Sequence, residues 1–350
     1  MSAPALPTRP VGGGRTGVAV TEIGLGCTGL GNLYAAQGED AAMAAVEASH
    51  AAGVRYFDAA PLYGFGLAEH RLGAALRRLG PASDVVLSTK VGWRLVPRGR
   101  GPGAAPAGPA EALFDRAAPF RPLGDWSYDG AMRSFEDSLH RLGTDRVDIL
   151  FLHDVDRRNH GEDGYRARFR EAMDGAYRAM LRLREEGAVR AIGAGLNEWE
   201  ACRDFAEAGD FDLFLLAGRY TLLDHGGALD GLLPLCVARG IGIVLGGPYN
   251  SGVLATGPAP GARYDYAPAS AEVLERTRRL ELACARHGVP LAAAALRFPL
   301  LHPAVCSVIP GARDAAEAEA NLRLHAHPIP AALWDEMKRE GLIRADAPTA

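Results

Sequence analysis

The amino-acid sequence predicts a single (β/α)8 barrel. Short apolar or β-branched runs alternate with longer segments of helical pattern along the 350 residues. The short runs are apolar nearly throughout, as expected of parallel strands that are buried on both faces. No G-x-G-x-x-G begins directly after the first run: the match GLGCTG, residues 24–29, starts inside that run and not in a turn after it, which argues against a doubly wound dinucleotide-binding sheet. We therefore expect one domain, residues 1–350, with eight strands enclosed by helices.

The pattern places each expected element in turn. The expected strands are Ile23–Gly26, Val54–Phe57, Val85–Thr89, Val147–Leu152, Val189–Gly195, Leu213–Ala217, Ile241–Leu245 and Val305–Ile309. The helices expected between them include Glu39–Ala52, Leu67–Leu79, Tyr128–Leu142, Phe169–Glu186, Trp199–Ala208, Ala228–Arg239 and Ala271–His287. A closing helix and a short tail are expected from Ala331 onward.

Three stretches differ from this alternation. Residues 1–20 alternate around glycines, and we expect an N-terminal arm or hairpin that plugs the barrel floor. Residues 96–119 are dominated by Gly, Pro and Ala and predict a long flexible loop after the third strand, over any active site at the C-terminal face. The polar segment 154–169 follows the fourth strand, and its charges are interpreted as a solvated loop.

Composition excludes several classes of function. The net charge of −4 and a sequence pI near 6.2 give no basic surface for nucleic acid or anionic lipid. No apolar run is long enough to span a bilayer, and the N-terminus lacks the order of a signal peptide. The five cysteines form no C-x-x-C pair and no zinc spacing, so we expect reduced thiols, no metal and a cytoplasmic protein.

Four polar side chains lie at the ends of adjacent expected strands. Asp58 ends the second strand, Lys90 the third and His153 the fourth, while Tyr63 lies on the loop after the second. In a parallel barrel these ends meet at one mouth, where active sites are found. We therefore expect these four side chains to converge.

Their chemistry suits proton transfer at a carbonyl or alcohol oxygen. Tyrosine has a pKa near 10, and a nearby ammonium favours its ionised form. Lys90 could supply that ammonium, and it is one of only two lysines among 38 basic residues. Asp58 would hold the ammonium charged, and His153 would orient the substrate oxygen.

Seven segments carry a family resemblance: IGLGCTGLGN, GVRYFDAAPLYGFGLAEHRLG, VVLSTKVG, SLHRLGTDRVDILFLHDVD, GAVRAIGAGLNEWE, YNSGVLATG and VIPGARDAAEAEANL. In this order they resemble the aldo-keto reductase family along almost the whole chain. That family is a (β/α)8 barrel that binds a nicotinamide cofactor without a Rossmann fold. The resemblance implies that Asp58, Tyr63, Lys90 and His153 are its catalytic tetrad, with Tyr63 as the general acid/base.

The resemblance also implies a site for NAD or NADP. Asn197 corresponds to the family's ligand of the nicotinamide carboxamide. The loop 250–254, with Ser251, Gly252 and Leu254, corresponds to the loop that binds the pyrophosphate. Gly311, Arg313 and Asn321 correspond to the adenosine end of the site.

Three positions depart from the family pattern. Arg219 replaces the Gln that often follows the sixth strand, and Tyr249 is offered in place of the aromatic that stacks on the nicotinamide, since that position is Gly246. Glu317 replaces a Gln near the adenosine. Glu317 would repel a 2′-phosphate whereas Arg313 would attract one, so the sequence favours NAD but leaves use of both cofactors open.

The resemblance is stronger to the D-threo-aldose 1-dehydrogenase and L-fucose dehydrogenase branch, on LLAGRYTLLD, FRPLGDWSYDGAMRSFEDSL, GGPYNSGVLATG and LRFPLLHPAVCSVIPGAR. This implies oxidation of C1 of an aldose such as L-fucose, from hemiacetal to lactone. A pyridoxal 4-dehydrogenase-like enzyme and a reductase of aldehydes or ketones remain alternatives. A cofactor-binding regulatory subunit is a further alternative, because the same barrel serves that role in some relatives. The expected partner is thus a small sugar or carbonyl compound, and the oligomeric state stays open.

Three aromatic residues lie in or near the long loop after the third strand. Trp93, Trp126 and Tyr128 have two interpretations of equal weight. They form a wall of the substrate pocket, against a sugar ring or a pyridine face, or they pack the loop onto the barrel.

Overall fold

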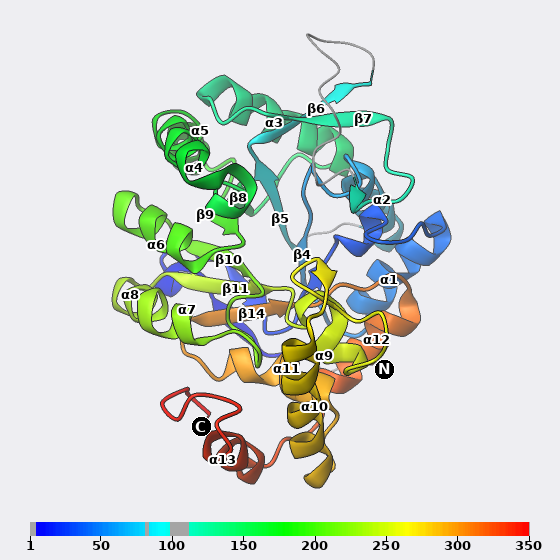
Figure 1. Cartoon of the computed structure of the whole chain (residues 1–350). Helices are drawn as coiled ribbons and strands as arrows, with labels where there is room; N and C mark the ends of the chain where they lie inside the picture. Colours follow the sequence, from blue (N-terminus) through cyan, green and yellow to red (C-terminus); the bar gives the residue numbers. More distant parts are fainter. Residues whose placement is uncertain (1–4, 81–83, 99–111, 350) are drawn as a thin grey trace.

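The computed structural model describes residues 5–80, 84–98 and 112–349, and within them eight parallel strands form one sheet at the centre of the molecule (Figure 1). The strands, in spatial order, are β14 (Val305–Ile309), β11 (Gly242–Gly246), β10 (Leu213–Ala217), β9 (Ala191–Leu196), β8 (Ile149–His153), β5 (Val86–Val91), β4 (Tyr56–Asp58) and β3 (Leu25–Gly26). Each lies within or beside a segment that the apolar pattern predicts, so the strand assignment is confirmed.

The two edges of this sheet meet and make the barrel. Isolated parallel bridges join Ile23 to Val308 and Gly26 to Gly311, next to β3 and β14. The amide of Gly24 donates to the carbonyl of Val308 at 2.9 Å. The predicted (β/α)8 architecture is confirmed, and the first and last strands close it.

Helices surround the barrel on its outer side (Figure 1). They are α1 (Glu39–Ala51), α2 (Leu67–Leu79), α3 (Tyr128–Leu142), α4 (Arg157–Asp174), α5 (Ala176–Glu185), α6 (Trp199–Ala208), α7 (Gly226–Gly231), α8 (Leu233–Arg239), α9 (Val253–Thr256), α10 (Ala271–Arg286), α11 (Leu291–Leu300), α12 (Ala315–His325) and α13 (Ala331–Arg339). Side chains cap several of their first turns; Ser127 accepts from the amide of Gly130, and Asp314 from that of Glu317. Within the described ranges, no helix has the length and hydrophobicity needed to cross a membrane.

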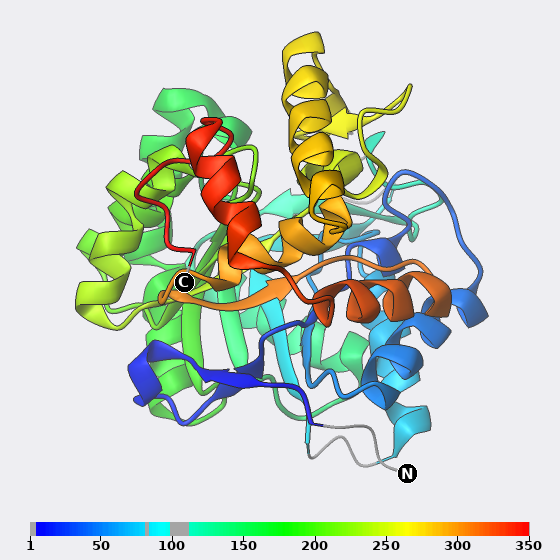
Figure 2. The same ribbon diagram turned by 90° about the horizontal axis from the view of Figure 1, so that it is seen from below.

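The expected N-terminal hairpin is present. Strands β1 (Thr8–Pro10) and β2 (Ala19–Thr21) pair in antiparallel fashion and cross beneath the barrel, where Figure 2 draws them in blue. Val20 lies fully buried in an apolar cluster with Tyr56 and Phe151 of the barrel strands. The hairpin therefore fills the barrel floor, at the end opposite the expected site.

The two ends of the long loop after β5 pair with each other and form a second hairpin. Strands β6 (Trp93–Pro97) and β7 (Phe120–Gly124) pair in antiparallel fashion, with Trp93 opposite Gly124. The loop expected over residues 96–119 is therefore partly strand, and its central residues 99–111 lie outside the described residues.

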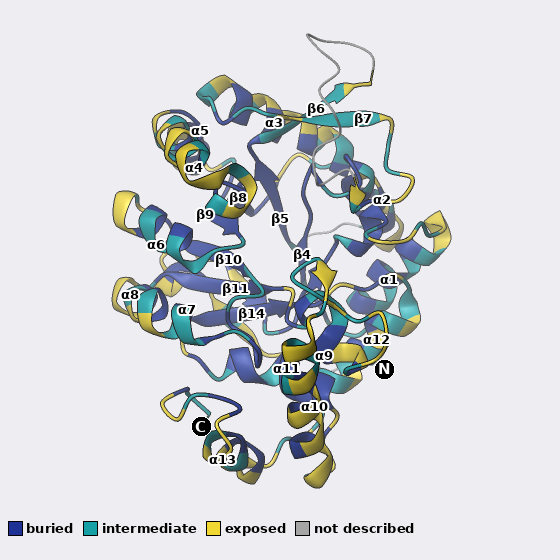
Figure 3. Ribbon diagram, in the orientation of Figure 1, coloured by how far each residue is buried: buried dark blue, intermediate teal, exposed yellow. Residues whose placement is uncertain are grey.

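Burial follows this arrangement, with the strands buried and the outer helix faces exposed (Figure 3).

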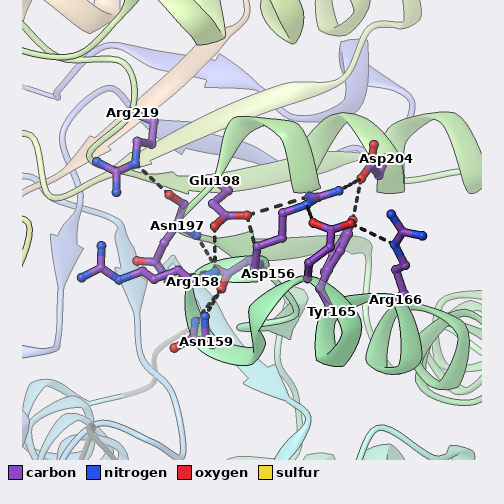
Figure 4. A network of polar contacts seen from close by, with 11 residues as sticks. Asp156, Arg158, Asn159, Tyr165, Arg166, Asn197, Glu198, Asp204 and Arg219 are labelled. Atoms are coloured by element: carbon purple, nitrogen blue, oxygen red, sulfur yellow. Dashed lines mark hydrogen bonds and ion pairs between the residues drawn. The ribbon is translucent and has the colours of Figure 1, made fainter.

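The segment 154–169 departs from the expected solvated loop, because α4 starts at Arg157. Asp156 caps that helix by accepting from the amide of Asn159, and Gly161, with φ 66°, kinks it. Tyr165 donates to Asp204 of α6 at 2.7 Å (Figure 4). The segment is thus helical from Arg157 on and bonded to α6 through Tyr165, while charged side chains such as Glu162 and Arg166 remain exposed.

We predict that Val20→Ala lowers the free energy of unfolding by about 1–3 kcal/mol, because it opens a cavity in the barrel floor. Urea denaturation followed by circular dichroism measures this change. Val237→Ala is the matched control: Val237 is 51% exposed, and the change at a surface site is expected to stay within about 0.5 kcal/mol. Equal losses in the two variants would contradict the packing of the hairpin.

Candidate active site

A cavity of about 340 Å³ opens at the C-terminal ends of the barrel strands. Its lining includes three of the four tetrad candidates, Tyr63, Lys90 and His153, and the cofactor candidate Asn197. The remaining lining residues are Thr28, Leu33, Leu62, Leu113, Phe114, Asp154, Arg158, Asn159, Gly195, Leu196, Leu215, Ala217, Asp265, Tyr266 and Ala267. The structure therefore brings the residues expected from four different strands into one pocket.

An ion pair between Lys90 and Asp58 forms the base of the site. Lys90 Nζ lies 2.6 Å from Asp58 Oδ2 and donates to the carbonyl of Ala59 at 2.8 Å. Ser88 donates to the other carboxylate oxygen of Asp58 at 2.6 Å. Both charged side chains are almost wholly buried, and burial raises the pKa of Asp58 while Lys90 and Ser88 lower it.

Tyr63 lies above this ion pair. Lys90 Nζ is 4.7 Å from the centroid of the Tyr63 ring, and the His153 ring meets the Tyr63 ring edge-on at 5.9 Å. Phe114, from the loop after β5, lies 6.4 Å from Tyr63 between ring centroids. Tyr63 is thus enclosed by a cation, an imidazole and an aromatic ring.

Two glycines allow the Tyr63 loop to approach the loop after β3. A Cβ on Gly31 would lie 2.6 Å from the carbonyl carbon of Tyr63, which no real contact permits. Gly64 has φ 63°, in the left-handed region that favours glycine, and a Cβ there would lie 2.5 Å from the carbonyl oxygen of Gly31. The position of Tyr63 therefore depends on this backbone contact.

The expectation of a lowered tyrosine pKa is not met in this structure. Burial raises the pKa of Tyr63 well above its usual value, and the carboxyl groups of Asp58 and Asp154 raise it further. A hydrogen bond with Thr28 acts in the opposite direction. The ammonium of Lys90 is neutralised by Asp58 at 2.6 Å, so little of its charge is left to stabilise a tyrosinate.

His153 is neutral in this environment. Burial, and then the charge of Lys90, lower its pKa well below 6.5. Its backbone is fixed by Trp126, whose indole donates to the His153 carbonyl at 3.1 Å. A neutral imidazole at the cavity wall can share a hydrogen bond with a substrate oxygen.

Asp154, directly after His153, was not among the residues expected to form the site. Its Oδ1 lies 3.6 Å from His153 Nε2. Burial is the main cause that raises the pKa of Asp154 to about 8, and the charge of Asp156 adds to it, while Lys90, Asn197 and Trp93 act against it. An acidic residue directly after a strand end was the sequence signal that could have identified it.

Asn197 is held from two sides (Figure 4). Its backbone amide donates to Asp156 Oδ2 at 2.9 Å, and its side-chain amide lies 3.2 Å from both Asp154 Oδ1 and Asp156 Oδ2. Arg219 donates to the Asn197 carbonyl at 2.9 Å. Asn197 therefore lies at the cavity with its amide orientation fixed by carboxylates.

Arg219 does not line the cavity, although it was expected to contact the cofactor. Its guanidinium bonds to Asp224 at 3.3 Å and to Asp265 at 3.0 Å. Asp265 and Tyr266 form the turn between β12 (Arg263–Tyr264) and β13 (Ala267–Pro268) and do line the cavity. Arg219 thus fixes a loop that covers the site.

The other cofactor candidates lie in two groups. Tyr249 donates to Asn321 Oδ1 at 2.8 Å, and Asn321 donates to the carbonyl of Gly311 at 3.0 Å. The Ser251 hydroxyl accepts from the amide of Tyr266 at 2.8 Å, which ties the expected pyrophosphate loop to the β12–β13 turn. In that loop Gly252 has φ 106°, and the Leu254 side chain is buried in the core. The amides of Gly252 and Leu254 both donate to the carbonyl of Tyr249, at 3.0 and 3.1 Å.

Arg313 and Glu317, the two residues with opposite implications for the cofactor, bond to each other. Arg313 Nε lies 2.8 Å from Glu317 Oε1, and the Arg313 amide donates to Glu317 Oε2 at 2.9 Å. The Arg313 side chain is 57% exposed, so the pair faces solvent beside the start of α12. Its positive charge is compensated within the protein.

The three aromatic candidates for a substrate wall do not line the cavity. Trp126 is buried, and its ring lies edge-on to Trp93 at 5.2 Å and to His160 at 5.2 Å. Trp93 stacks on His160 at 6.4 Å, and Tyr128 packs at the edge of the core on α3. These contacts are those expected from the packing interpretation, and in addition Trp126 bonds to the His153 carbonyl and Trp93 lowers the pKa of Asp154.

No group of three or more His, Cys, Asp or Glu side chains is placed to hold a metal ion within residues 5–80, 84–98 and 112–349. The groups around the Tyr63 ring are the buried Lys90–Asp58 ion pair beneath it and the neutral imidazole of His153 beside it, and the amide of Asn197 lines the same cavity. Groups of this kind at the C-terminal mouth of a barrel are suited to proton transfer at a carbonyl or alcohol oxygen.

Comparison with known proteins identifies the family. The model of the Aldo/keto reductase family matches residues 22–340, so the chain belongs to that family. Its members use nicotinamide cofactors, and the chain is accordingly an NAD(P)-dependent oxidoreductase.

Two curated relatives match over nearly their full length. Pyridoxal 4-dehydrogenase from Microbacterium luteolum is 42% identical over 94% of this chain and 96% of the relative. D-threo-aldose 1-dehydrogenase from a Pseudomonas species is 39% identical over 93% and 96%. Among solved structures, the holo form of an aldo-keto reductase from Bacillus halodurans superposes with a TM-score of 0.73, at 25% identity and 98% coverage of both chains.

We predict that Gly31→Ala lowers kcat at least about tenfold, because the added methyl displaces the backbone of Tyr63, and a small misplacement of a reacting group is costly. Steady-state kinetics with a nicotinamide cofactor measures the change. Gly38→Ala is the control, since a Cβ at Gly38 meets nothing within 4 Å. Unchanged kcat in Gly31→Ala would show that Tyr63 does not depend on this contact.

The raised pKa of Asp154 predicts a pH-dependent stability. A carboxyl group whose pKa rises from 3.8 to about 8 on folding stabilises the fold fully below pH 3.8 and loses that contribution as the pH rises to 8. We expect the unfolding free energy of the wild type, relative to Asp154→Asn, to fall between pH 4 and 8. Urea denaturation of both proteins across this range measures it, and a constant difference would contradict the raised pKa.

Proposed function

We propose that the protein is an NAD(P)-dependent dehydrogenase that oxidises C1 of an aldose, such as L-fucose, from the cyclic hemiacetal to the lactone. The observation that carries this proposal is the buried Lys90–Asp58 pair beneath Tyr63, within a cavity that also holds His153. The aldose dehydrogenase at 39% identity supports the substrate class. We also infer that residues 1–350 act as one domain in the cytoplasm, which agrees with five free, buried cysteines.

The proposed reaction breaks the C–H bond of the hemiacetal carbon and the O–H bond of the hydroxyl group on that carbon. Tyr63, as the general base, accepts the proton of the anomeric hydroxyl while the hydride leaves C1, and the C1=O bond of the lactone forms. His153, which is neutral, hydrogen-bonds the same oxygen and fixes its direction. The buried charges of Lys90 and Asp58 set the electrostatic potential at the Tyr63 phenol. In the reverse direction, Tyr63 returns the proton to the substrate oxygen.

The candidates for binding a nicotinamide dinucleotide lie partly in the cavity: Asn197 lines it, and the others lie outside its lining. When bound in its oxidised form, this cofactor supplies the hydride acceptor and a positive charge that favours the tyrosinate. Asn197 would bind the carboxamide with its amide, which is oriented by Asp154 and Asp156. The loop that contains Ser251, Gly252 and Leu254 would contact the pyrophosphate. Tyr249 would lie against the nicotinamide, and Gly311 and Asn321 would hold the adenosine.

We favour NAD over NADP. Arg313 would meet a 2′-phosphate only after its ion pair with Glu317 is broken, and the Glu317 carboxylate would repel the phosphate. Ribose hydroxyl groups, in contrast, can donate to a carboxylate.

Pyridoxal is the second candidate substrate, because the pyridoxal 4-dehydrogenase is 42% identical over 94% of this chain. Pyridoxal also closes to a cyclic hemiacetal, so the same proton and hydride transfers would give a lactone. The two candidates differ in the groups around the reacting carbon and not in the chemistry.

The proposal is tested by initial rates with L-fucose, D-arabinose, L-galactose and pyridoxal, each with NAD and with NADP, read as absorbance at 340 nm. We expect oxidation of at least one aldose and a preference for NAD. Oxidation of pyridoxal alone would establish the second candidate. No oxidation of any of the four, with NADH still bound, would reject both dehydrogenases in favour of a carbonyl reductase or a regulatory subunit.

We predict that Tyr63→Phe lowers kcat at least about 100-fold, since loss of a general acid/base has effects of this size. The affinity for NADH, measured by fluorescence titration, is expected to stay near that of the wild type. Retained turnover would refute the role of Tyr63, and loss of both activity and NADH binding would indicate a damaged fold.

We predict that Glu317→Gln raises kcat/KM for NADP relative to NAD about tenfold, because it removes a carboxylate worth about 1 kcal/mol or more of repulsion and releases Arg313. Glu319→Gln on the same helix is the control, since Glu319 pairs with Arg323 on an exposed turn. The same shift in both variants would argue against a direct role of Glu317 at the 2′-position.

A further inference from the structure

Asp154 extends from the catalytic wall into the cavity. It follows His153 directly and lines the same pocket as Tyr63 and Lys90. Its φ of 57° lies in the left-handed region, which is costly for a residue with a Cβ. Two hydrogen bonds hold it there: its amide donates to the carbonyl of Gly195 at 3.0 Å, and its carbonyl bonds to His160 Nε2 at 2.8 Å. A strained residue at a site is a reason to look for a function.

The Asp154 carboxyl has unused hydrogen-bonding capacity. In the described part of the chain, its side chain shares one hydrogen bond, with the Asn197 amide at 3.2 Å. The Trp93 indole lies close enough to lower the pKa of Asp154, but its Nε1 has no hydrogen-bond partner among the described residues. Asp156, two residues later, accepts four bonds, two from Asn159 and two from Asn197. Asp156 thus makes the side-chain hydrogen bonds that hold this loop, whereas the Asp154 side chain lines the cavity.

The nearby cations are committed to other carboxylates. Lys90 pairs with Asp58, and Arg158, which also lines the cavity, pairs with Asp265. His153 lies 3.6 Å away but is neutral. Among the described residues, therefore, no cation forms an ion pair with Asp154, and a neutral hydroxyl group is the ligand that suits it.

The spacing of Asp154 and His153 indicates which hydroxyl this is. His153 Nε2 and Asp154 Oδ1 lie 3.6 Å apart, so they can bind two oxygens that lie a similarly short distance apart. Oxygens on adjacent carbons of a sugar ring meet this requirement. We propose that Asp154 is a specificity-determining residue that hydrogen-bonds the C2 hydroxyl of the aldose while His153 holds the oxygen on C1. The inference rests on the proposed function and names the part of the substrate that the site recognises, the C2 hydroxyl group.

The test compares two sugars that differ only at C2. D-Arabinose carries the C2 hydroxyl, and 2-deoxy-D-ribose is the same sugar without it. The quantity measured is the ratio of their kcat/KM values with NAD. We expect the wild type to prefer D-arabinose about tenfold or more, as a hydrogen bond made in a buried site allows.

Two variants separate recognition from folding. Asp154→Gly removes the carboxyl and adopts φ 57° without strain, whereas Asp154→Asn keeps the shape and hydrogen-bonding groups and tolerates this conformation. We expect the ratio to fall to near one in Asp154→Gly and to be largely retained in Asp154→Asn. A purely structural role would lower both kcat/KM values together and leave the ratio unchanged, which would overturn the inference.

A binding measurement keeps the inference apart from the proposed function. The probe is 1,5-anhydro-L-fucitol, which keeps the C2 hydroxyl but has no hydroxyl on the reacting carbon and cannot be oxidised. Titration calorimetry with NAD present should show weaker binding to Asp154→Gly than to the wild type and to Asp154→Asn. This result without turnover of any sugar would reject the dehydrogenase but support the C2 contact. Equal affinity in all three proteins, or no binding to the wild type, would overturn the inference.

Discussion

The buried ion pair between Lys90 and Asp58 is the interaction on which the site depends. Two charges without solvent are costly unless they are paired and hydrogen-bonded, and here Ser88 adds a bond to Asp58 and the Ala59 carbonyl accepts one from Lys90. Removing either partner would leave an isolated buried charge, at a cost of about 3–5 kcal/mol. The same pair joins β4 to β5 and lies beneath Tyr63, so one contact serves strand pairing and the electrostatics of the phenol.

The barrel and the convergence of the tetrad candidates could be predicted from the sequence for a geometric reason. Parallel strands in a closed barrel end at the same face, so Asp58, Lys90 and His153 needed only correct strand assignments to be placed together. The apolar runs supplied those assignments. The helix α4 was missed because Gly161 and a dense set of charges hide its periodicity, and its stability comes from contacts with α6 that no local pattern contains.

Other parts of the site could not be predicted because they depend on tertiary contacts. Asp265 and Tyr266 reach the cavity from a turn that ion pairs hold in place, and the sequence of that turn carries no sign of its partners. Trp126 turned out to be buried behind the strand ends, where its indole holds the His153 carbonyl. The pKa of Tyr63 moved opposite to expectation, since burial and the nearby carboxylates outweigh an ammonium that Asp58 already neutralises.

The closure of the barrel between its first and last strands has a consequence for synthesis. Gly26, two residues after the bond from Gly24 to Val308, pairs with Gly311, close to the other end of the chain. A ribosome releases the N-terminal strands, with Asp58, Tyr63 and Lys90, long before the segment that seals them. Until residues beyond Val305 have emerged, β3 presents an open edge with unpaired backbone groups. The nascent chain therefore holds every tetrad candidate but no closed barrel, and it is exposed to strand-edge association during that interval.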